Sequence, residues 1–238
     1  MKRRAKGGEA GGYSPNDWLP WAGPWFDRGC VAIGLLLLAL LLWRGIGVAW
    51  SSALLLLVVA FEVNDLVVGV VHWALDKYWR YESAVVGNLV RTFRGHHPDP
   101  QELCTHGYVE TNSNMYPIVG VLAVVVLVFA RAPATCWFMF WLLLIAANSA
   151  TIHQWAHLER PPLLVRVLQR ARILIAPEIH LRHHDGHMSH YCAISGHVNY
   201  LADGLGIWRK LEWLIARTTG AKPFHELPLE VQRAEGGA

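Results

Sequence analysis

Four long apolar stretches dominate this chain of 238 residues and limit most strongly what it can fold into. They run from Cys30 to Trp43, from Val48 to Trp73, from Pro117 to Ala130 and from Ala134 to about Ala150. A helix needs about 20 apolar residues to cross the hydrocarbon of a bilayer, and flanking Gly, Ala and Trp residues extend the shorter stretches. We therefore predict an all-α integral membrane protein with about four transmembrane helices.

The composition and the connecting turns support this interpretation. Hydrophobic residues make up 53% of the chain and charged residues only 16%, which is too apolar for an ordinary soluble domain. Only residues Arg44 to Gly47 and Arg131 to Pro133 separate the members of each pair of stretches, which predicts two helical hairpins. We expect a partly disordered cytoplasmic segment over residues 1–28, the membrane domain over 29–222 and a polar tail over 223–238.

Lysine and arginine residues predict the orientation of the helices. Residues 1–29 carry 5 of the 21 Lys and Arg residues, residues 72–116 carry 4, residues from 158 onward carry 10, and the tight turns carry 2. Because Lys and Arg are retained on the cytoplasmic side, we expect both termini and the central segment in the cytoplasm, with the protein in the inner membrane if it is bacterial. This topology explains the formal net charge of +3, and nothing indicates a nucleic-acid partner.

Histidines form tight groups at the ends of the apolar stretches. Ten of the 13 histidines belong to these groups: His72, His96, His97, His106, His153, His157, His180, His183, His184 and His187. Side chains four residues apart share one face of a helix, so His153 and His157 predict a ligand pair. The last four histidines follow the same helical spacing, with offsets of 0, 3, 4 and 7. Neutral imidazole is the commonest metal-binding side chain, and the sequence predicts a cytoplasmic, histidine-rich helical cap that binds metal.

The number of histidines argues for two metal ions. A structural zinc ion takes four ligands and a catalytic zinc ion takes three and a water molecule, whereas this chain offers eight to ten imidazoles. A lone histidine or one pair four residues apart is more often structural, so the interpretation depends on the whole set. Imidazole binds iron, zinc and copper, and the ligands alone leave the metal open.

Polar residues interrupt the second apolar stretch. Glu62, Asn64 and Asp65 lie among apolar neighbours, where ionisable groups are costly and usually functional. Glu62, Asp65, Gly69 and His72 share one helix face, and Gly69 allows a neighbouring helix or an acyl chain to approach. We expect the Asp65 carboxylate to orient a metal-binding histidine from another helix; the alternative is a buried polar network between helices.

Asp99 lies in the sequence His96-His97-x-Asp99-Pro100. Pro100 biases Asp99 away from the helical region towards an extended conformation, so the two histidines are expected at a chain reversal. There the Asp99 carboxylate is predicted to accept a hydrogen bond from an imidazole N–H and so to orient a ligand. The alternative is an aspartate that only forms a turn or caps a helix.

Five ordered motifs carry a family resemblance. They are Asp65-xxx-Gly69-xx-His72-Trp73; Phe93-Arg94-x-His96-His97-x-Asp99-Pro100; His106 with Glu110-Thr111-Asn112; His153-x-Trp155-x-His157; and His180-xx-His183-His184-xx-His187 with Tyr191-Cys192 and Asn199-Tyr200. This pattern resembles the plasmanylethanolamine desaturase family, the lipid desaturases of the Kua or CarF type. The resemblance runs from about Asp65 to Phe224, and only the first helix and the two tails lie outside it.

The resemblance implies an activity and a set of ligands. Members of the family insert a double bond next to the ether oxygen in the sn-1 alkyl chain of plasmanylethanolamine-type phospholipids, giving the vinyl ether of plasmalogens. They use dioxygen, two iron ions and an external electron donor such as a cytochrome b5-type protein or a ferredoxin; zinc can replace iron in preparations. The family's eight histidines correspond to His72, His96, His97, His153, His157, His180, His183 and His184. His106 and His187 also match family positions and rank just below these eight.

One position departs from the usual desaturase boxes. Phe93 stands where an HxxHH box has its first histidine, and we expect His72 to supply the missing nitrogen. Arg94 and Arg182 are candidates for binding the substrate phosphate, although both also serve as positive charges that set the topology. The membrane phospholipid itself is the expected partner.

Chemistry independent of the resemblance agrees with a desaturase. Removing hydrogen from an unactivated methylene requires an oxidant stronger than any side chain, so the hard step belongs to metal and oxygen. The chain has no GxGxxG, CxxCH or ferredoxin cysteine spacing, which implies a separate reductant.

Several other functions stay open at this point. The alternatives of the same class are an acyl desaturase acting on another phospholipid, such as phosphatidylglycerol as in plant relatives, and a membrane lipid hydroxylase. The alternatives of another class are a zinc-dependent membrane hydrolase and a metal-binding or transport protein. Ligands gathered at helix ends disfavour transport, and the absence of HExxH disfavours a protease.

Overall fold

The computed structural model describes residues 23–80, 82–83, 86–186 and 188–227. Most of the predicted disordered segment 1–28 and of the predicted polar tail 223–238 therefore lies outside the described residues. Within the described part every regular element is a helix, which confirms the all-α prediction. The helices are α1 (Pro24–Gly45), α2 (Trp50–Lys77), α3 (Gly87–Gly95), α4 (Pro100–Leu103), α5 (Tyr108–Asn112), α6 (Tyr116–Phe129), α7 (Pro133–Ala147), α8 (Ser149–His157), α9 (Leu163–Arg170), α10 (Pro177–His184), α11 (His197–Gly204), α12 (Ile207–Thr219) and the 3₁₀ helix η1 (Phe224–Glu226).

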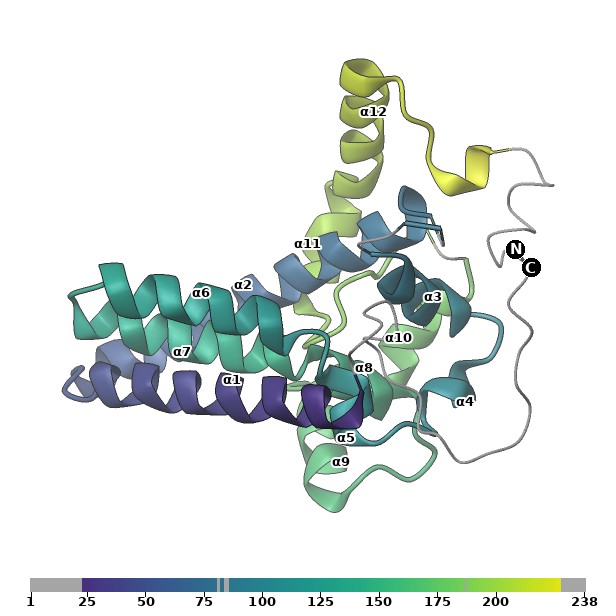
Figure 1. Ribbon diagram of the computed structural model, residues 1–238. Coiled ribbons are helices and arrows are strands. Elements are labelled where there is room, and N and C mark those ends of the chain that lie inside the picture. Colours follow the sequence, from purple (N-terminus) through teal and green to yellow (C-terminus); the bar gives the residue numbers. More distant parts are fainter. Residues whose placement is uncertain (1–22, 81, 84–85, 187, 228–238) are drawn as a thin grey trace.

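Four helices form an elongated bundle, and α7 is its central member (Figure 1). α7 contacts α1, α2 and α6, and a core that includes Leu38, Leu41, Tyr116 and Leu143 fills the space between α1, α6 and α7. The two short turns lie at one end of the bundle, as expected. α6 and α7 pack as a hairpin, whereas α1 packs against both α6 and α7, and α2 packs mainly against α7. Both predicted pairs of helices are joined by short turns, but only in the second pair do the two helices pack closely against each other.

The four apolar stretches form helices of different lengths. α1 with 22 residues and α2 with 28 residues are long and apolar enough to cross a membrane. α7 and α8 reach this length only together, because the chain bends by 45° between them. α6 has 14 residues, so it rises about 21 Å at 1.5 Å per residue, short of the roughly 30 Å hydrocarbon core. The described residues therefore contain two helices long and apolar enough to cross a membrane, or three if α7 and α8 form one bent span. The sequence predicted about four.

The bend between α7 and α8 turns the histidines of α8 away from the bundle axis. Asn148 stands at the break; its amide nitrogen donates to the carbonyl of Leu144 at 2.8 Å, and its amide oxygen accepts from the Tyr108 hydroxyl at 2.9 Å. On the C-terminal side of the break, a second core that includes Ile152, Ile175 and Ile194 joins α8 to the region around α10. The bend and this core bring α8 and α10 into contact at the end of the bundle opposite the tight turns (Figure 1).

Candidate metal centre

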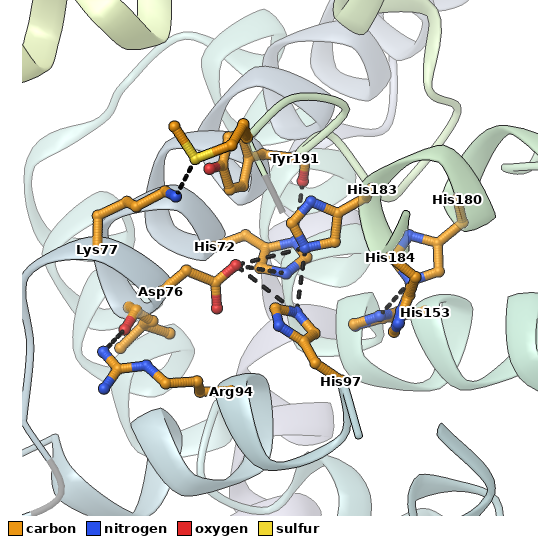
Figure 2. Close-up of polar contacts among 12 residues, drawn as sticks. His72, Asp76, Lys77, Arg94, His97, His153, His180, His183, His184 and Tyr191 are labelled. Carbon is orange, nitrogen blue, oxygen red and sulfur yellow. Dashed lines mark hydrogen bonds and ion pairs between the residues drawn. The ribbon is translucent and has the colours of Figure 1, made fainter. Parts of the chain in front are cut away.

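The eight histidines of the predicted set converge at this end of the bundle. Figure 2 shows His72, His97, His153, His180, His183 and His184. α2 carries His72, and the turn that follows α3 carries the pair at positions 96 and 97. α8 carries the pair at 153 and 157 on one face, and α10 carries the three at 180, 183 and 184. The side chains separate into two adjacent groups of candidate metal ligands.

The first group, here called the five-histidine group, contains His96, His153, His157, His180 and His184. One ring nitrogen from each lies within 4.8 Å of those of the others. The Nε2 atom of His180 lies 2.8 Å from Nε2 of His153, 3.0 Å from Nε2 of His157 and 3.1 Å from Nε2 of His184. Helical spacing on α8 and α10 produces this convergence, as the sequence predicted.

The second group, here called the aspartate group, contains His72, Asp76, His97 and His183. Asp76 is 5% exposed. Its Oδ2 atom lies 3.4 to 3.7 Å from the Nε2 atoms of all three histidines. Asp76 was not predicted as a ligand from the sequence, although it follows His72 by four residues and therefore shares its helix face. A carboxylate at the end of an apolar stretch looks like an ordinary surface residue until the fold buries it.

The donor atoms of the five-histidine group fit a divalent metal ion. A neutral imidazole has one N–H and one lone pair, so nitrogens that face one another this closely cannot all be paired by hydrogen bonds. Burial, and then the neighbouring imidazoles of His183 and His157, lower the pKa of His180 well below its ordinary 6.5. His180 is therefore neutral at pH 7, with a lone pair available for a metal.

The aspartate group fits a cation for a different reason. Neither carboxylate oxygen of Asp76 accepts a hydrogen bond from the described residues, and the Nε2 atom of His72 is likewise buried without one. A buried carboxylate without hydrogen bonds is costly, and a metal ion would satisfy both this carboxylate and the His72 nitrogen. Three nitrogens and one oxygen form a donor set that zinc and iron accept.

The two groups lie next to each other. The ring centroids of His97 and His184 are 5.1 Å apart, and those of His72 and His153 are 5.4 Å apart. His183 and His184 are sequence neighbours but belong to different groups. This arrangement can hold two metal ions side by side.

Backbone carbonyls fix the orientation of two histidines in the aspartate group. The Nδ1 atom of His72 lies 3.0 Å from the carbonyl oxygen of Tyr191, and Nδ1 of His183 lies 2.9 Å from the carbonyl oxygen of Ser189. Because a carbonyl oxygen only accepts hydrogen bonds, Nδ1 carries a proton in both rings. Each Nε2 therefore presents its lone pair towards Asp76, the arrangement typical of metal-binding histidines.

Asp65 acts on the segment that supplies these carbonyls, which differs from its expected contact with a histidine. Asp65 is 0% exposed, and its carboxylate accepts five hydrogen bonds from residues 194–198. The donors are the backbone N–H groups of Ile194, Ser195, Gly196 and Val198 and the hydroxyl of Ser195, at 2.9 to 3.2 Å. Here residues 189–198 are called the carbonyl segment, and Asp65 is the residue that holds it on α2.

Gly69 allows the carbonyl segment to lie against α2. A Cβ atom at this position would lie 2.5 Å from Sγ of Cys192 and 3.2 Å from its backbone nitrogen. The close approach that the sequence predicted at Gly69 is therefore real, and the neighbour is the carbonyl segment. Asn64 donates to the carbonyl of Leu142 at 2.5 Å, so α2 and α7 also share a polar contact.

The two histidines ranked below the eight have different outcomes. His106 lies outside them, with Nδ1 3.7 Å from a carboxylate oxygen of Glu110. His187 lies outside the described residues. α10 ends at His184, so the predicted helical stripe stops three residues before His187. Among the described residues, His106 is therefore not a member of either candidate ligand group.

Asp99 lies outside the helical region, as Pro100 predicts, with φ −138° and ψ 79°, but its ψ is smaller than that of a fully extended residue. It stands at the N-cap of α4, where its side chain makes no capping hydrogen bond, and it is exposed. The expected bond to an imidazole is not among the described contacts. Asp76 occupies the place beside the histidines that the sequence analysis gave to Asp99.

Arg94 has a different role from the expected phosphate contact. It is 4% exposed, and its Nη2 donates to the carbonyl oxygens of Leu75 at 2.9 Å and Trp79 at 2.7 Å, while its guanidinium lies 4.0 Å from the ring centroid of Phe224. These bonds tie α3 to the end of α2 and so hold His97 beside Asp76. Arg182 is exposed on α10, and its contact with phosphate stays a prediction.

Comparisons with known proteins identify the family of the region that contains this site. A family model described as the lipid desaturase domain matches residues 61–226, which include all eight histidines and Asp76. Plasmanylethanolamine desaturase 1 of Mus musculus is 32% identical over 173 residues, covering 68% of this chain and 64% of the mouse protein. Plasmanylethanolamine desaturase of Myxococcus xanthus is 31% identical over 196 residues, covering 77% and 68%. Fatty acid desaturase 4 of Arabidopsis thaliana, a chloroplast protein, is 30% identical over 174 residues, covering 68% and 51%.

The chain thus spans about two thirds of the length of the mouse relative and half that of the plant relative. No solved structure is significantly similar to it. The family match covers more than half of the chain and contains both ligand groups, Asp65 and the carbonyl segment. The chain belongs to the lipid desaturase domain family.

Proposed function

We propose that this protein is a membrane-bound lipid desaturase that uses dioxygen and external electrons at a centre of two iron ions. The observation that carries the proposal is the pair of adjacent buried ligand groups, which together offer eight imidazoles and one carboxylate. We further propose that it forms the vinyl ether of plasmalogens from the sn-1 alkyl chain of plasmanylethanolamine-type phospholipids. The names of the mouse and Myxococcus relatives support this choice of substrate.

The reaction removes two hydrogen atoms from adjacent carbons of the alkyl chain. Dioxygen accepts these two hydrogens together with two external electrons and two protons and leaves as two water molecules. Two iron ions with dioxygen supply the oxidant for this step. In this proposal the protein holds the ions through neutral imidazoles, and Asp76 offsets one positive charge in the aspartate group.

Burial protects the site from side reactions. His72, His180 and His183 are almost fully buried, so bulk water is kept from the ligand atoms. Exclusion of water prevents the oxidising equivalents from being spent without product. The site also lies at the end of the bundle rather than in its middle (Figure 1). That position favours carbons close to the headgroup, such as those beside the ether oxygen.

The orientation and the redox partner follow as proposals. We place both termini and the metal centre in the cytoplasm, because most Lys and Arg residues flank that end of the helices. All four cysteines are free and lie apart in the sequence, which supports a separate source of electrons. A separate electron donor of the cytochrome b5 or ferredoxin type would deliver the two electrons.

A second substrate is favoured by one relative. The Arabidopsis protein carries the name fatty acid desaturase 4, so the same centre could act on an acyl chain of a phospholipid such as phosphatidylglycerol. A lipid hydroxylase would use the same ligands and differ in transferring oxygen to the substrate.

Lipid mass spectrometry separates these possibilities. The protein would be expressed in a host that lacks ether-lipid desaturation and is supplied with alkyl ether lipids, with the His180→Ala variant as the inactive control. Loss of two hydrogens from the alkyl chain, with acid lability of the product, supports the vinyl ether. A new acyl double bond would support the second substrate, and addition of one oxygen would show a hydroxylase.

A further inference from the structure

α12 presents one face to the protein and another to its surroundings. On the inner face Ile207, Trp208, Leu211 and Ile215 pack around Trp73 near the end of α2. The outer face carries Trp213, which is 65% exposed, and Leu214, which is 48% exposed. The inner face explains why α12 is fixed in position, whereas nothing in the described part of the chain covers the outer face.

Basic residues lie among the exposed apolar residues of the outer face. Arg209, Trp213 and Arg217 are spaced by four residues and share a side of the helix, and Lys210 lies beside them. All three basic side chains are exposed. Glu212 is the single acidic residue of α12, so the helix carries a net charge of +2 from three cations and one anion.

α11 continues the apolar surface towards α2. Tyr200 is 61% exposed, Leu201 60% and Leu205 52%, although α11 contacts α2 on its other side. The adjoining part of α2 exposes apolar side chains up to Val71. α11 therefore exposes apolar residues while it contacts α2, a helix whose apolar surface is expected to face lipid.

The direction of α12 fits a location at the membrane surface. Figure 1 shows α12 running across the direction of α1, α2, α6 and α7, near the end of the bundle that carries the histidines. If the bundle crosses the bilayer along its length, α12 lies in the plane of the headgroups. Amphipathic helices with Trp, Leu, Lys and Arg bind in this plane.

We propose that the arm formed by α11 and α12 binds the phospholipid headgroup layer beside the metal centre. Leu201, Leu205 and Trp213 enter the boundary between headgroups and acyl chains, while Arg209, Lys210 and Arg217 bind phosphates and extend their charges into the polar layer. The net positive charge favours an anionic leaflet. The proposal does not depend on which lipid is desaturated.

An acidic redox protein is the competing occupant of this surface. The basic residues by themselves would also bind an acidic protein. The exposed leucines and the contact of α11 with α2 favour the bilayer, because a short-lived protein contact does not require so much exposed apolar surface next to a membrane span.

The test uses the full chain in phospholipid nanodiscs that contain phosphatidylcholine and phosphatidylglycerol. A nitroxide spin label is attached at Trp213→Cys after Cys30 and Cys104 are replaced by serine. Glu102→Cys on α4, also exposed and distant from the bundle in Figure 1, is the matched control. Collisions with oxygen, which concentrates in lipid, are compared with collisions with a water-soluble nickel complex.

We expect the label at position 213 to collide with the nickel complex several-fold less often than the label at 102, and with oxygen more often. Adding Arg209→Glu, Lys210→Glu and Arg217→Glu to the variant labelled at position 213 should raise its rate of collision with the nickel complex towards the control value. Retention of bound metal by that variant shows that it is folded. Equal nickel accessibility at 213 and 102, or protection of 213 only when an acidic electron-donor protein is added, would overturn the proposal.

Discussion

The five-histidine group and the aspartate group lie side by side, but the chain builds them in different ways. The first uses imidazoles alone, and most of them come from the spacing of residues on α8 and α10. The second combines three imidazoles with Asp76, and the Nδ1 atoms of His72 and His183 face carbonyls of the carbonyl segment. Local helix geometry sets the first group, whereas contacts between distant parts of the chain set the second.

This difference has a chemical consequence. Five neutral imidazoles leave both charges of a divalent ion uncompensated, whereas Asp76 cancels one of them. Asp65 and Gly69 precede the ligand His72 in α2 by seven and three residues. Both residues allow the carbonyl segment to be held against α2. We therefore expect the aspartate group to be sensitive to changes remote from the metals and the five-histidine group to be sensitive mainly to loss of a ligand.

The largest effect is expected from removing a ligand of the five-histidine group. His157→Ala and His184→Ala should each abolish desaturation, because their nitrogens converge with that of His180 and no other described side chain replaces them. His225→Ala, in the exposed 3₁₀ helix, should be nearly silent. Product formation by lipid mass spectrometry measures the three variants, and substantial activity in either ligand variant would remove α8 or α10 from the metal site.

Asp76→Asn should rank second and should affect one metal selectively. The amide keeps the shape but loses the charge, so the aspartate group should lose affinity by more than the roughly 10 to 100-fold typical of groups that only support a ligand. Metal analysis should then find one ion per chain instead of two.

Asp99→Asn is the matched control for Asp76→Asn. The sequence favoured a loss of iron and turnover in this variant, but the exposed position of Asp99 at the N-cap of α4 predicts that both are retained. Loss of metal in Asp99→Asn and not in Asp76→Asn would reverse the assignment of the two aspartates.

Asp65→Asn should weaken the aspartate group by about 10-fold, the lower end of the range for supporting groups. An asparagine has one acceptor oxygen, and its amide N–H groups would face the backbone N–H donors of residues 194–198. Amide exchange in these residues should accelerate, and one metal should be lost more readily. Faster exchange with unchanged metal affinity would show that the carbonyl segment does not control the ligands.

The smallest effect concerns the contact between Glu62 and His197, one turn of α2 before Asp65. The Glu62 carboxylate lies 2.9 Å from Nδ1 of His197, and this hydrogen bond raises the pKa of His197 above its ordinary 6.5. A raised pKa in the folded state contributes stability below pH 6.5, and this stability is lost as the pH rises through the higher folded value. The gain is small because the two side chains are 45% and 36% exposed.

Glu62→Gln should therefore lower the melting temperature slightly at pH 6 and hardly at all at pH 8, with both metals retained. A larger loss at pH 8 than at pH 6 would contradict the assigned direction. Loss of one metal in this variant would extend the control of the aspartate group from Asp65 to Glu62.

The parts predicted from the sequence were those fixed by local spacing. Apolar stretches located the bundle helices, and offsets of three and four residues located the ligands on α8 and α10. Asp76 was missed because its burial depends on α3 and α10 closing over the end of α2, which no local pattern records. Asp65 was placed in the right region with the wrong partner, since its hydrogen bonds go to residues about 130 positions later in the chain. The end of α10 at His184 was also missed, because histidine spacing continues where the helix does not.

Metal content of the wild-type chain tests the central claim most directly. Protein prepared without oxygen and loaded with iron should bind two ions per chain, one in each group, and the Asp76→Asn variant should keep only one. Zinc in place of iron leaves this count unchanged, because zinc binds such ligands more strongly than ferrous iron does. One ion per chain in both proteins, with the remaining histidines free to titrate, would contradict the account.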